Sequence, residues 1–472
     1  MTENAHPASP AVDPQRAAAQ AILEQLRSEG HQAYLAGGCV RDLLLGRVPK
    51  DYDVATSATP DVVLDLLPRT FAVGAHFGVV LVSMEIGGEA TLTEVATFRH
   101  DGAYSDGRHP DAVQYTLDPR EDVERRDFTI NGLLLDGLSL DTNLRDSVLD
   151  YVGGLSDLDA GIIRAIGDPI RRFEEDHLRM LRAVRFAARL DFAIDPPTLA
   201  AMRALASRIQ AVSAERIRDE LTCILTQGNV RRAFELLDES GLLAEVLPEA
   251  IKLKGVAQPP QYHPEGDVWV HTMLLLNQLQ PGCPMTLAWG TLLHDIGKPA
   301  TFTPPQYPGD RIRFNGHVEV GVRIAAEICR RFRFSNEETA QVLALVQNHM
   351  RFADTPHMKA STLKRFFRLD RFEDHLTLHK MDCLASSGNL DHYNFAKKQF
   401  ESMPEEQVRP TPLLTGRELI AAGYRPGPLF KSILRTVEDA QLEGTIHTPE
   451  EAMALAQQLA TSAATASSAG PA

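Results

Sequence analysis

The sequence predicts an α+β protein, with a mixed β-sheet domain in roughly the first 150 residues and α-helices in the remainder. Between residues 30 and 150, short segments rich in Val, Ile and Thr alternate with short helical segments. From residue 174 onward, apolar residues recur every three to four positions, which is the period of an amphipathic helix. The 472 residues are enough for about two to four domains.

The first domain is expected to open with a helix and then to alternate between strands and helices. Thr59 followed by Pro60 predicts a helix start, and GGE at 87–89 predicts a turn between two strands. In order, the expected elements are a helix at 16–29, a strand within 31–38 ending at a glycine turn, a short helix at 41–46, a strand at 50–56, a helix at 59–67, and strands at 79–86 and 90–98.

Composition shifts suggest where the domains meet. The stretch KGVAQPPQYHPEG (254–266) is rich in Pro and Gly and is typical of a linker, and TFTPPQYPGD (301–310) is typical of a loop. Both chain ends are of low complexity and are expected to be disordered. We therefore expect a lead at 1–15, a sheet domain at 16–150, a helical domain at 151–253, a second helical domain at 254–400, a helical segment at 401–458 and a tail at 459–472.

Composition and charge narrow the class of protein. The five cysteines are scattered without a CxxC pair, which is typical of a reducing, cytoplasmic environment. There is no apolar run of about 18 residues and no secretory leader, so we expect neither a membrane span nor export. The net charge of −15 argues against a general nucleic-acid coat, yet residues 171–189 carry six arginines against three acids.

A first candidate site combines glycines, an arginine and carboxylates. Asp51 and Asp53, two positions apart on an expected strand, would point to the same face, where only a cation such as Mg²⁺ relieves their repulsion. Gly37–Gly38 lead into a helix whose N-terminus favours phosphate, and Arg41 follows one turn later. Glu94, on a later strand, is a third candidate ligand. Such a two-metal site suits nucleotidyl transfer.

Further polar clusters follow. In ERRDFTINGLLLD (124–136), Arg126 is placed to clamp a phosphate, although a helix start with exposed charges would look similar. In EEDHLRMLRAVRF (174–186), a single helix would put Asp176 and Arg179 side by side. An aspartate only accepts hydrogen bonds and an arginine only donates them. Together they complement cytosine and adenine, which present an amine donor beside a ring-nitrogen acceptor, but not guanine or uracil, which present a carbonyl acceptor beside an N–H donor. The alternative is a surface ion pair.

Five segments follow one another in this order: LAGGCVRDLLLG, KDYD, TEVATFR, RRDFTINGLLLD and EEDHLRMLRAVRFAARL. On these segments, over residues 30–250, the chain resembles the class II tRNA nucleotidyltransferase and bacterial poly(A) polymerase superfamily. Within it, the chain looks most like the CCA-adding enzymes. The resemblance implies a nucleotidyltransferase-type head, a helical neck and body, two catalytic Mg²⁺ ions, and CTP, ATP and the tRNA 3′ end as partners. It further implies the metal-binding and catalytic residues Asp51, Asp53 and Glu94, and the nucleotide-binding residues Gly37, Gly38, Arg41, Arg126, Asp127, Asn131, Asp176, Arg179, Arg182 and Arg185.

Alternatives remain open within this resemblance. The long polar stretch at 99–124 resembles the flexible loop of CCA-adding enzymes, which disfavours a CC-only enzyme but not a specialised A-adding enzyme. A poly(A) polymerase is a further alternative, as is a hydrolase with a regulatory nucleotide-binding head. VSAERIRDELTCIL (212–225) resembles the neck helices of the family, with Glu215 and Arg216 expected to brace the base-reading segment. The sequence does not indicate an oligomeric state.

A second candidate site consists of histidines and aspartates in the C-terminal half. An adjacent His–Asp pair inside an apolar helix is costly to bury without a partner. The ordered set resembles the HD superfamily of metal-dependent phosphohydrolases, which implies a divalent metal, with Mn²⁺, Ni²⁺, Fe or Mg²⁺ suited to imidazole and carboxylate, and hydrolysis of phosphoesters such as 2′,3′-cyclic tRNA ends. Its expected ligands are His271, His294, Asp295 and Asp382 at the core, with His317 and His349 for a second ion.

Overall fold

The computed structural model describes residues 13–72, 78–102, 113–137 and 143–468. It divides into two compact units, Met1–Ile251 and Lys252–Ala472, which are described separately below. The first contains the β-sheet, and the second is helical, so the predicted α+β class is confirmed.

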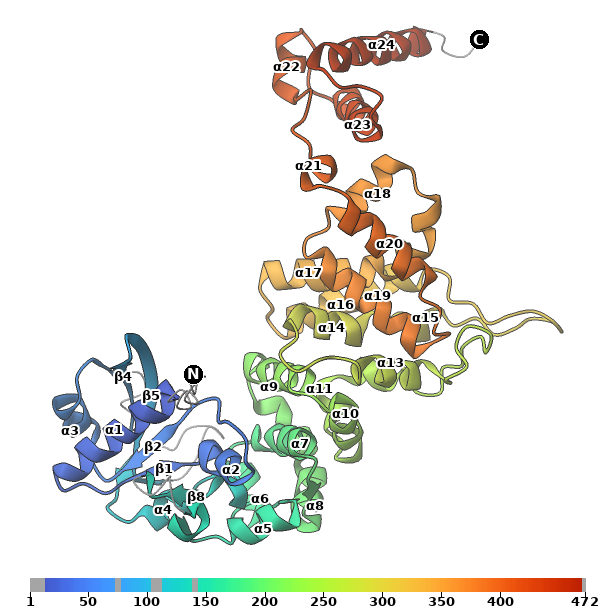
Figure 1. Cartoon of the computed structure of the whole chain (residues 1–472). Coiled ribbons are helices and arrows are strands. Elements are labelled where there is room, and N and C mark those ends of the chain that lie inside the picture. Colours follow the sequence, from blue (N-terminus) through green and yellow to red (C-terminus); the bar gives the residue numbers. More distant parts are fainter. Residues whose placement is uncertain (1–12, 73–77, 103–112, 138–142, 469–472) are drawn as a thin grey trace, which may run out of the picture. The chain divides into compact units, whose positions relative to one another are not determined.

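The first unit is built on a seven-stranded mixed sheet in the order β3-β4-β5-β2-β1-β8-β9 (Figure 1). All neighbours are antiparallel except β2 and β5, which pair in parallel. Two short pairs, β6 with β7 and β10 with β11, lie outside it. The strands are β1 Ala33–Ala36, β2 Asp53–Thr56, β3 Thr70–Phe71, β4 Val79–Ile86, β5 Glu89–Thr97, β6 Arg99–Asp101, β7 Val113–Tyr115, β8 Leu133–Leu135, β9 Val148–Asp150, β10 Ile162–Ile163 and β11 Ala193–Ile194.

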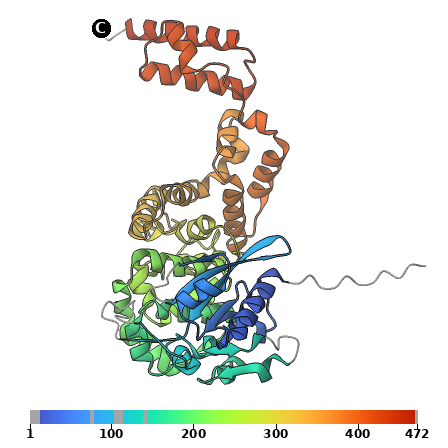
Figure 2. The ribbon, with the colours of Figure 1, turned by 90° about the vertical axis from the view of Figure 1, so that its left-hand side faces the viewer.

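Strands β4 and β5 form the long hairpin that the GGE turn predicts. Gly87 and Gly88 both have positive φ, at 62° and 89°, as a two-residue hairpin turn requires. Only Val95–Thr97 of β5 pair with β2, and β3 pairs only with Leu81 and Val82 of β4, so the turn end of the hairpin projects from the sheet (Figure 2). The hairpin therefore holds Glu94 where β5 meets β2.

The helices of the first unit begin where the sequence offers caps. Thr59 is at the N-cap position of α3, although its side chain makes no capping hydrogen bond, and Pro60 is the first residue of the helix, as predicted. The helix α1 buries Ala18, Ile22 and Leu26 and contacts β1, β2, β4 and β5. The helices are α1 Pro14–Ser28, α2 Gly38–Leu44, α3 Pro60–Leu66, α4 Pro119–Glu124, α5 Gly154–Ala160, α6 Pro169–Glu175, α7 Arg179–Leu190, α8 Pro196–Leu205, α9 Ala214–Thr226, α10 Val230–Glu239, α11 Leu242–Val246 and α12 Pro248–Ile251.

Three local expectations are wrong. The helix expected across 174–190 is two helices, because Asp176 adopts an extended conformation (φ −150°) and its carboxylate accepts from the amide of Leu178 instead of continuing the helix. Strand β2 begins at Asp53, so Asp51 precedes it. A short strand, β11, interrupts the helices expected after residue 174.

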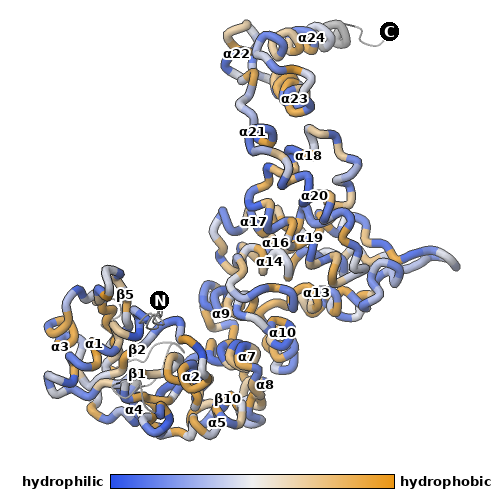
Figure 3. Tube along the Cα trace, in the orientation of Figure 1, coloured by the Kyte–Doolittle hydropathy of each residue, from blue (hydrophilic) through white to orange (hydrophobic). Residues whose placement is uncertain are grey.

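The second unit is helical throughout its regular elements. Helices α13 and α14 are apolar over most of their lengths (Figure 3), which fits their burial. The helices are α13 Val268–Leu276, α14 Met285–Leu293, α15 Lys298–Thr301, α16 His317–Arg331, α17 Asn336–Asn348, α18 Ala360–Phe367, α19 Phe372–Ala385, α20 Asp391–Ser402, α21 Glu405–Val408, α22 Gly416–Ala421, α23 Pro428–Glu443 and α24 Pro449–Ser468, with a 3₁₀ segment η6 at His349–His357.

The tail expected at 459–472 is mostly the end of α24, which reaches Ser468. Alanine, the commonest residue in this segment, has the highest helix propensity of any residue. This propensity favours a helix although the segment is of low complexity. Residues 1–12 and 469–472, also expected to be disordered, lie outside the described residues, as do 103–112 of the predicted loop. In the part of the chain that the structure describes, helices fall short of the length and apolarity that crossing a bilayer demands.

Candidate active site and metal centre

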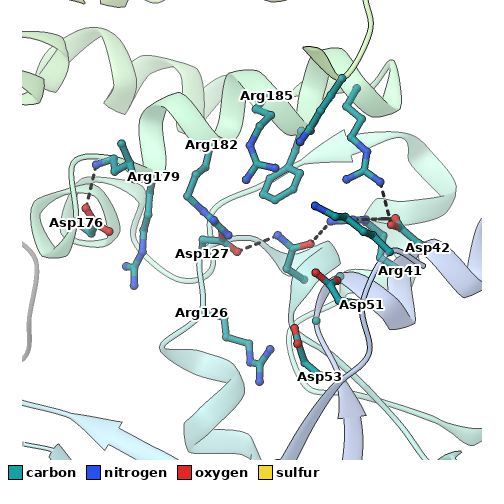
Figure 4. A pocket seen from close by; sticks show the side chains of 18 of the residues that line it. Arg41, Asp42, Asp51, Asp53, Arg126, Asp127, Asp176, Arg179, Arg182 and Arg185 are labelled. Carbon is teal, nitrogen blue, oxygen red and sulfur yellow. Dashed lines mark hydrogen bonds and ion pairs between the residues drawn. The ribbon is translucent and has the colours of Figure 1, made fainter. Parts of the chain in front are cut away.

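The first unit contains a cavity of about 550 Å³ that is strongly basic (Figure 4). Nine cationic side chains and five carboxylates line it, a net of +4 on a chain whose net charge is −15. Such a cavity suits a polyanion that also carries a metal ion. The charged residues lining it are Arg41, Asp42, Lys50, Asp51, Asp53, Arg125, Arg126, Asp127, Asp176, Arg179, Arg182, Arg185, Arg189 and Arg216.

Two carboxylates line one edge of this cavity, and a third lies beside them on the neighbouring strand. Asp53 is the first residue of β2, and Asp51 lies two residues before it, on the approach to the strand. Val54 pairs with Val95 in the parallel register, which places Glu94 next to Asp53 on the neighbouring strand. Burial, Glu94 and Asp51 together raise the pKa of Asp53 to about 7, in spite of Arg126 nearby. A carboxylate cluster with this mutual repulsion suits a divalent cation.

Gly37 and Arg126 fit each other closely. Gly37 precedes α2 with a φ of +75°, and a Cβ on it would lie 3.0 Å from Nη1 of Arg126. Arg126 is anchored from the other side by Asp122, whose Oδ2 lies 2.9 Å from its Nη2. The backbone angle therefore favours glycine, and any larger residue would also press on the guanidinium of Arg126.

The other predicted nucleotide ligands of the head contact one another. Arg41 is only 2% exposed and donates to Oδ1 of Asn131 at 2.6 Å. The Asn131 amide donates to Asp127 at 3.0 Å, and Arg182 donates to the other oxygen of Asp127 at 2.6 and 2.8 Å. Burial alone would raise the pKa of Asp127, but Arg182 and Asn131 outweigh it and hold the pKa at about 2. These side chains form the hydrogen-bonded floor of the cavity (Figure 4).

The predicted base-reading pair has a different geometry from the one expected. Asp176 lies between α6 and α7, and its carboxylate is bound by Arg216 of α9 at 2.7 and 3.2 Å. Arg179, the first residue of α7, contacts Glu175 and donates to the carbonyls of Arg172 and Arg125 at 3.0 and 3.1 Å. Asp176 and Arg179 both line the cavity, but they are not paired with each other through their side chains. Arg216 contacts the segment that it is expected to brace. Arg185 pairs with Glu220 at 2.7 Å.

The second unit gathers all six predicted HD-type residues. His271 is on α13, His294 and Asp295 follow α14, His317 begins α16, His349 follows α17, and Asp382 is on α19. They form two groups, each with ligand atoms within 4.8 Å of one another: His271, His294 and Asp382 in one, and Asp295, His317 and His349 in the other.

Asp295 lies between the two groups. Its Oδ2 is 3.2 Å from Nε2 of His294, and its Oδ1 is 3.7 Å from Nε2 of His349. Burial alone would raise the pKa of Asp295, but Lys298 and His294 hold it well below its usual range. Nε2 of His271 and of His294 are buried and lie 3.1 and 3.2 Å from carboxylate oxygens of Asp382 and Asp295, without the geometry of a good hydrogen bond. Buried imidazole nitrogens that face carboxylates in this way fit a divalent metal centre.

Sequence analysis missed four residues around this centre. Glu265 accepts from Nδ1 of His271 at 2.7 Å and contacts His263 at 2.9 Å. The buried Lys298 bonds Asp295 and Gln258, both at 2.7 Å. Three of the four are in the stretch 254–266, which the Pro and Gly content suggests is a linker but which packs against the metal centre. The HDIGK run, with a lysine one helical turn after the aspartate, was a usable signal for Lys298.

A cavity of about 560 Å³ opens onto the metal centre. It combines cations with apolar side chains, as a site for a phosphate attached to a ring would. Its lining includes Tyr262, His263, Lys298, Arg311, Arg313, Phe314, Met350, His379 and His392.

Family models match three consecutive segments of the chain. They are described as a "Poly A polymerase head domain" at 33–164, a "Probable RNA and SrmB- binding site of polymerase A" at 191–253, and an "HD domain" at 268–382.

Several curated proteins are similar to this chain. A CCA-adding enzyme of Levilactobacillus brevis is 32% identical over 93% of this chain and 96% of its own length. A CCA-adding enzyme of Lactococcus lactis subsp. cremoris is 42% identical, over 47% of this chain and 53% of that protein.

Solved structures agree with these matches. The CCA-adding enzyme of Bacillus stearothermophilus, solved with CTP, superposes with a TM-score of 0.69 at 26% identity, over 96% of this chain and all of that chain. The Thermotoga maritima CCA-adding enzyme, solved with tRNA, shares the fold with a TM-score of 0.53 at 18% identity over 96% of this chain and 97% of its own. The chain therefore belongs to the CCA-adding enzyme family of tRNA nucleotidyltransferases, and its sequence carries an HD domain C-terminal to a poly(A) polymerase-type head domain.

Proposed function

We propose that this protein adds C and A from CTP and ATP to the 3′ end of tRNA without a template, releasing diphosphate. The observation that carries the proposal is the single basic cavity in which the carboxylates of Asp51 and Asp53 and the pair Asp176 and Arg179 all face the same space. One end of that space suits a metal-bound triphosphate and the other suits a base. The full-length similarity to a CCA-adding enzyme supports the same activity.

Asp51, Asp53 and Glu94 are the residues that would hold Mg²⁺. Burial, with Glu94 and Asp51 adding to it, raises the pKa of Asp53, and a cation at this point would relieve the repulsion among the three acidic groups. Bound Mg²⁺ would activate the tRNA hydroxyl and neutralise charge on the triphosphate. Arg126, fixed by Asp122 beside Gly37, is placed to donate to phosphate oxygens.

Asp176 and Arg179 would read the base. Asp176 would accept a hydrogen bond from the exocyclic amine of cytosine or adenine, and Arg179 would donate one to the adjacent ring nitrogen. Guanine and uracil present the reverse order and leave buried polar groups unpaired, which can cost about 10⁴-fold in specificity. Because Arg182, Asp127, Asn131 and Arg41 bond one another, we assign these four to shaping the cavity floor. Arg185, held by Glu220, faces the same space from α7.

One assay tests the nucleotidyl transfer. Transcripts of tRNA that end before CCA, after C and after CC are each offered CTP, ATP, GTP or UTP singly. Addition of C to the first two and of A to the third supports CCA addition. Extension of the CC end alone, by ATP alone, would identify a specialised A-adding enzyme. ATP incorporation into RNA that is not tRNA would identify a poly(A) polymerase instead.

The second unit supports a second activity, the hydrolysis of phosphoesters at a metal centre. His271, His294 and Asp382 would hold one divalent ion and His317 and His349 another, with one oxygen of Asp295 facing each. A bound ion such as Mn²⁺, Ni²⁺, Fe or Mg²⁺ would supply an activated water. Lys298, Arg311 and Arg313 on the cavity wall suit a phosphate group, and Tyr262 and Phe314 suit a ring. Terminal phosphates and 2′,3′-cyclic ends of tRNA are the substrates we propose.

The double variant His294→Ala/Asp295→Ala tests this second activity. Wild-type protein is assayed with Mn²⁺, Ni²⁺ or Mg²⁺ on RNA ending in a 2′,3′-cyclic phosphate and on a 3′-phosphate. The variant should lose hydrolysis and keep nucleotide addition, and full hydrolysis by the variant would exclude the assignment. We place both activities in the cytoplasm, where tRNA is processed, in keeping with the five unpaired cysteines.

A further inference from the structure

A buried aspartate on α2 joins two arginines from distant parts of the first unit. Asp42 is 4% exposed, and its Oδ1 accepts from its neighbour Arg41 at 2.8 Å. Its Oδ2 accepts from Nη2 of Arg189, which is 147 residues further along the chain, at 3.1 Å. Neither Asp42 nor Arg189 figures among the residues to which the resemblance assigns a role. A buried carboxylate shared by two guanidinium groups is a strong tie between the elements that carry them.

This tie is one end of a continuous chain of hydrogen bonds (Figure 4). From Asp42 it passes through Arg41 and Asn131 to Asp127, which accepts from Arg182. Arg182 and Arg189 both belong to α7 and are seven residues apart, which is about two helical turns. The chain therefore begins and ends on α7 and attaches that helix to the head at two separated points.

A packed aromatic ring fills the space between these two points. Phe186 is 5% exposed and lies on α7 between the two arginines. The guanidinium carbon of Arg41 is 5.1 Å from its ring centre, and that of Arg182 is 5.3 Å away. Because buried contacts of this kind leave little room for sliding, α7 is held in one register against α2.

The two helices lead to opposite ends of the cavity. Helix α2 is followed by the segment that brings Asp51 and Asp53 to the metal end. Helix α7 begins at Arg179, directly after Asp176, at the base end. We propose that Asp42 and Arg189 are positioning residues that hold the base-reading end in register with the metal-binding end. This inference rests on the proposed nucleotidyl transfer, in which a base and a triphosphate of one nucleotide must be bound at a fixed separation.

The test uses full-length Arg189→Gln, Asp42→Asn and the double variant, with Arg189→Lys as the conservative change. Arg203→Gln is the matched control, because Arg203 is an exposed α8 arginine paired with Glu239 outside the cavity. The assay measures kcat and KM for single-nucleotide addition on the tRNA end that the wild type extends, together with misincorporation of GTP and UTP. Rates are normalised to the folded fraction from circular dichroism.

A misplacement of about 1 Å can cost about 10²-fold in rate, so we expect kcat to fall about 10- to 100-fold in Arg189→Gln and Asp42→Asn. The KM for nucleotide should stay close to the wild-type value and misincorporation should rise. The double variant should be no worse than either single one, because both remove the same tie. Arg189→Lys should recover part of kcat.

Three results would overturn the inference. An increase in KM with unchanged kcat would mean that Arg189 binds the nucleotide directly. Wild-type kcat and fidelity per folded molecule would mean that the tie serves folding only. Additive losses in the double variant would mean that the two residues act separately. A wild-type protein that extends no tRNA end would overturn the nucleotidyl transfer itself, and an active wild type with unaffected variants would overturn only the positioning role.

Discussion

Arg216 of α9 binds both oxygens of Asp176, at 2.7 and 3.2 Å, in the cavity where a base is proposed to be read. The two residues are 40 positions apart in the sequence, and Asp176 lies outside any helix. The carboxylate of Asp176 is therefore already oriented by two donors of one guanidinium group, at the position proposed to read the base. A base that uses Asp176 has to share it with Arg216 or displace it.

Replacement of Arg216 should reduce base selectivity more than catalysis. In Arg216→Ala, the half-buried Asp176 loses the group that orients it, so we expect the preference for CTP and ATP over UTP and GTP to fall about tenfold or more. The measurement is kcat/KM for all four triphosphates. Arg218→Ala, on the same helix but outside the cavity, is the control. Equal selectivity in the two variants would show that Arg216 does not orient the reader.

Binding of Mg²⁺ at Asp53 should depend on pH. The pKa of Asp53 is raised to about 7 chiefly by burial, with Glu94 and Asp51 adding to it, so below pH 7 a proton competes with the ion. Apparent Mg²⁺ affinity should fall about tenfold for each pH unit below 7, and the ion should displace a proton. Calorimetry in buffers of different ionisation enthalpy measures both. Affinity that stays constant between pH 5.5 and 8 would contradict the prediction.

The raised pKa of Asp53 also determines how the stability of the ion-free protein changes with pH. Between about pH 4 and 7 the folded, ion-free protein binds a proton at Asp53 that the unfolded chain does not, so its stability falls as pH rises through this window. Above pH 7, Asp53→Asn should therefore melt at a higher temperature than ion-free wild type, and Mg²⁺ should stabilise only the wild type. Asp61→Asn, at an exposed position of α3, should leave the melting temperature unchanged.

Local patterns predicted the elements of the sheet domain, because caps and turns act over a few residues, whereas the six histidines and aspartates of the second unit, which span residues 271–382, were predicted from the resemblance to a known family. The break at Asp176 escaped prediction, since the apolar period runs on through a residue whose side chain competes with the helix backbone. The contact of Asp42 with Arg189 connects positions 147 residues apart, and no local pattern marks it. The contact of Arg216 with Asp176, over 40 residues, fits the bracing role that only the resemblance implies for Arg216. Glu265 was missed because its Pro- and Gly-containing surroundings look like a linker.

Glu265 should govern metal affinity in the second unit. Its Oε1 lies 2.7 Å from Nδ1 of the buried His271, an arrangement that turns Nε2 of that ring toward Asp382, where an ion is proposed to bind. Loss of such an outer partner typically weakens metal binding about 10- to 100-fold, and we expect this in Glu265→Ala. Mn²⁺ titration followed by electron paramagnetic resonance measures the affinity. Glu337→Ala, at an exposed position of α17, is the control, and equal affinities in the two variants would contradict the prediction.

Gly37→Ala should separate a backbone requirement from a steric one. Gly37 has φ +75° and ψ −129°, which non-glycine residues rarely adopt, and the strain should cost about 1–3 kcal/mol of unfolding free energy. The new Cβ would also lie 3.0 Å from Nη1 of Arg126, so the guanidinium has to shift from its present position. Gly46→Ala is the matched control, because Gly46 has φ +67° with no atom within 4 Å of the added Cβ.

Both alanine variants should therefore lose stability in urea unfolding, but only Gly37→Ala should bind CTP more weakly. If the Gly46 variant loses CTP affinity to the same extent, backbone strain in the head is sufficient to explain the loss. In that case the fit of Gly37 to Arg126 has no separate part in forming the phosphate site.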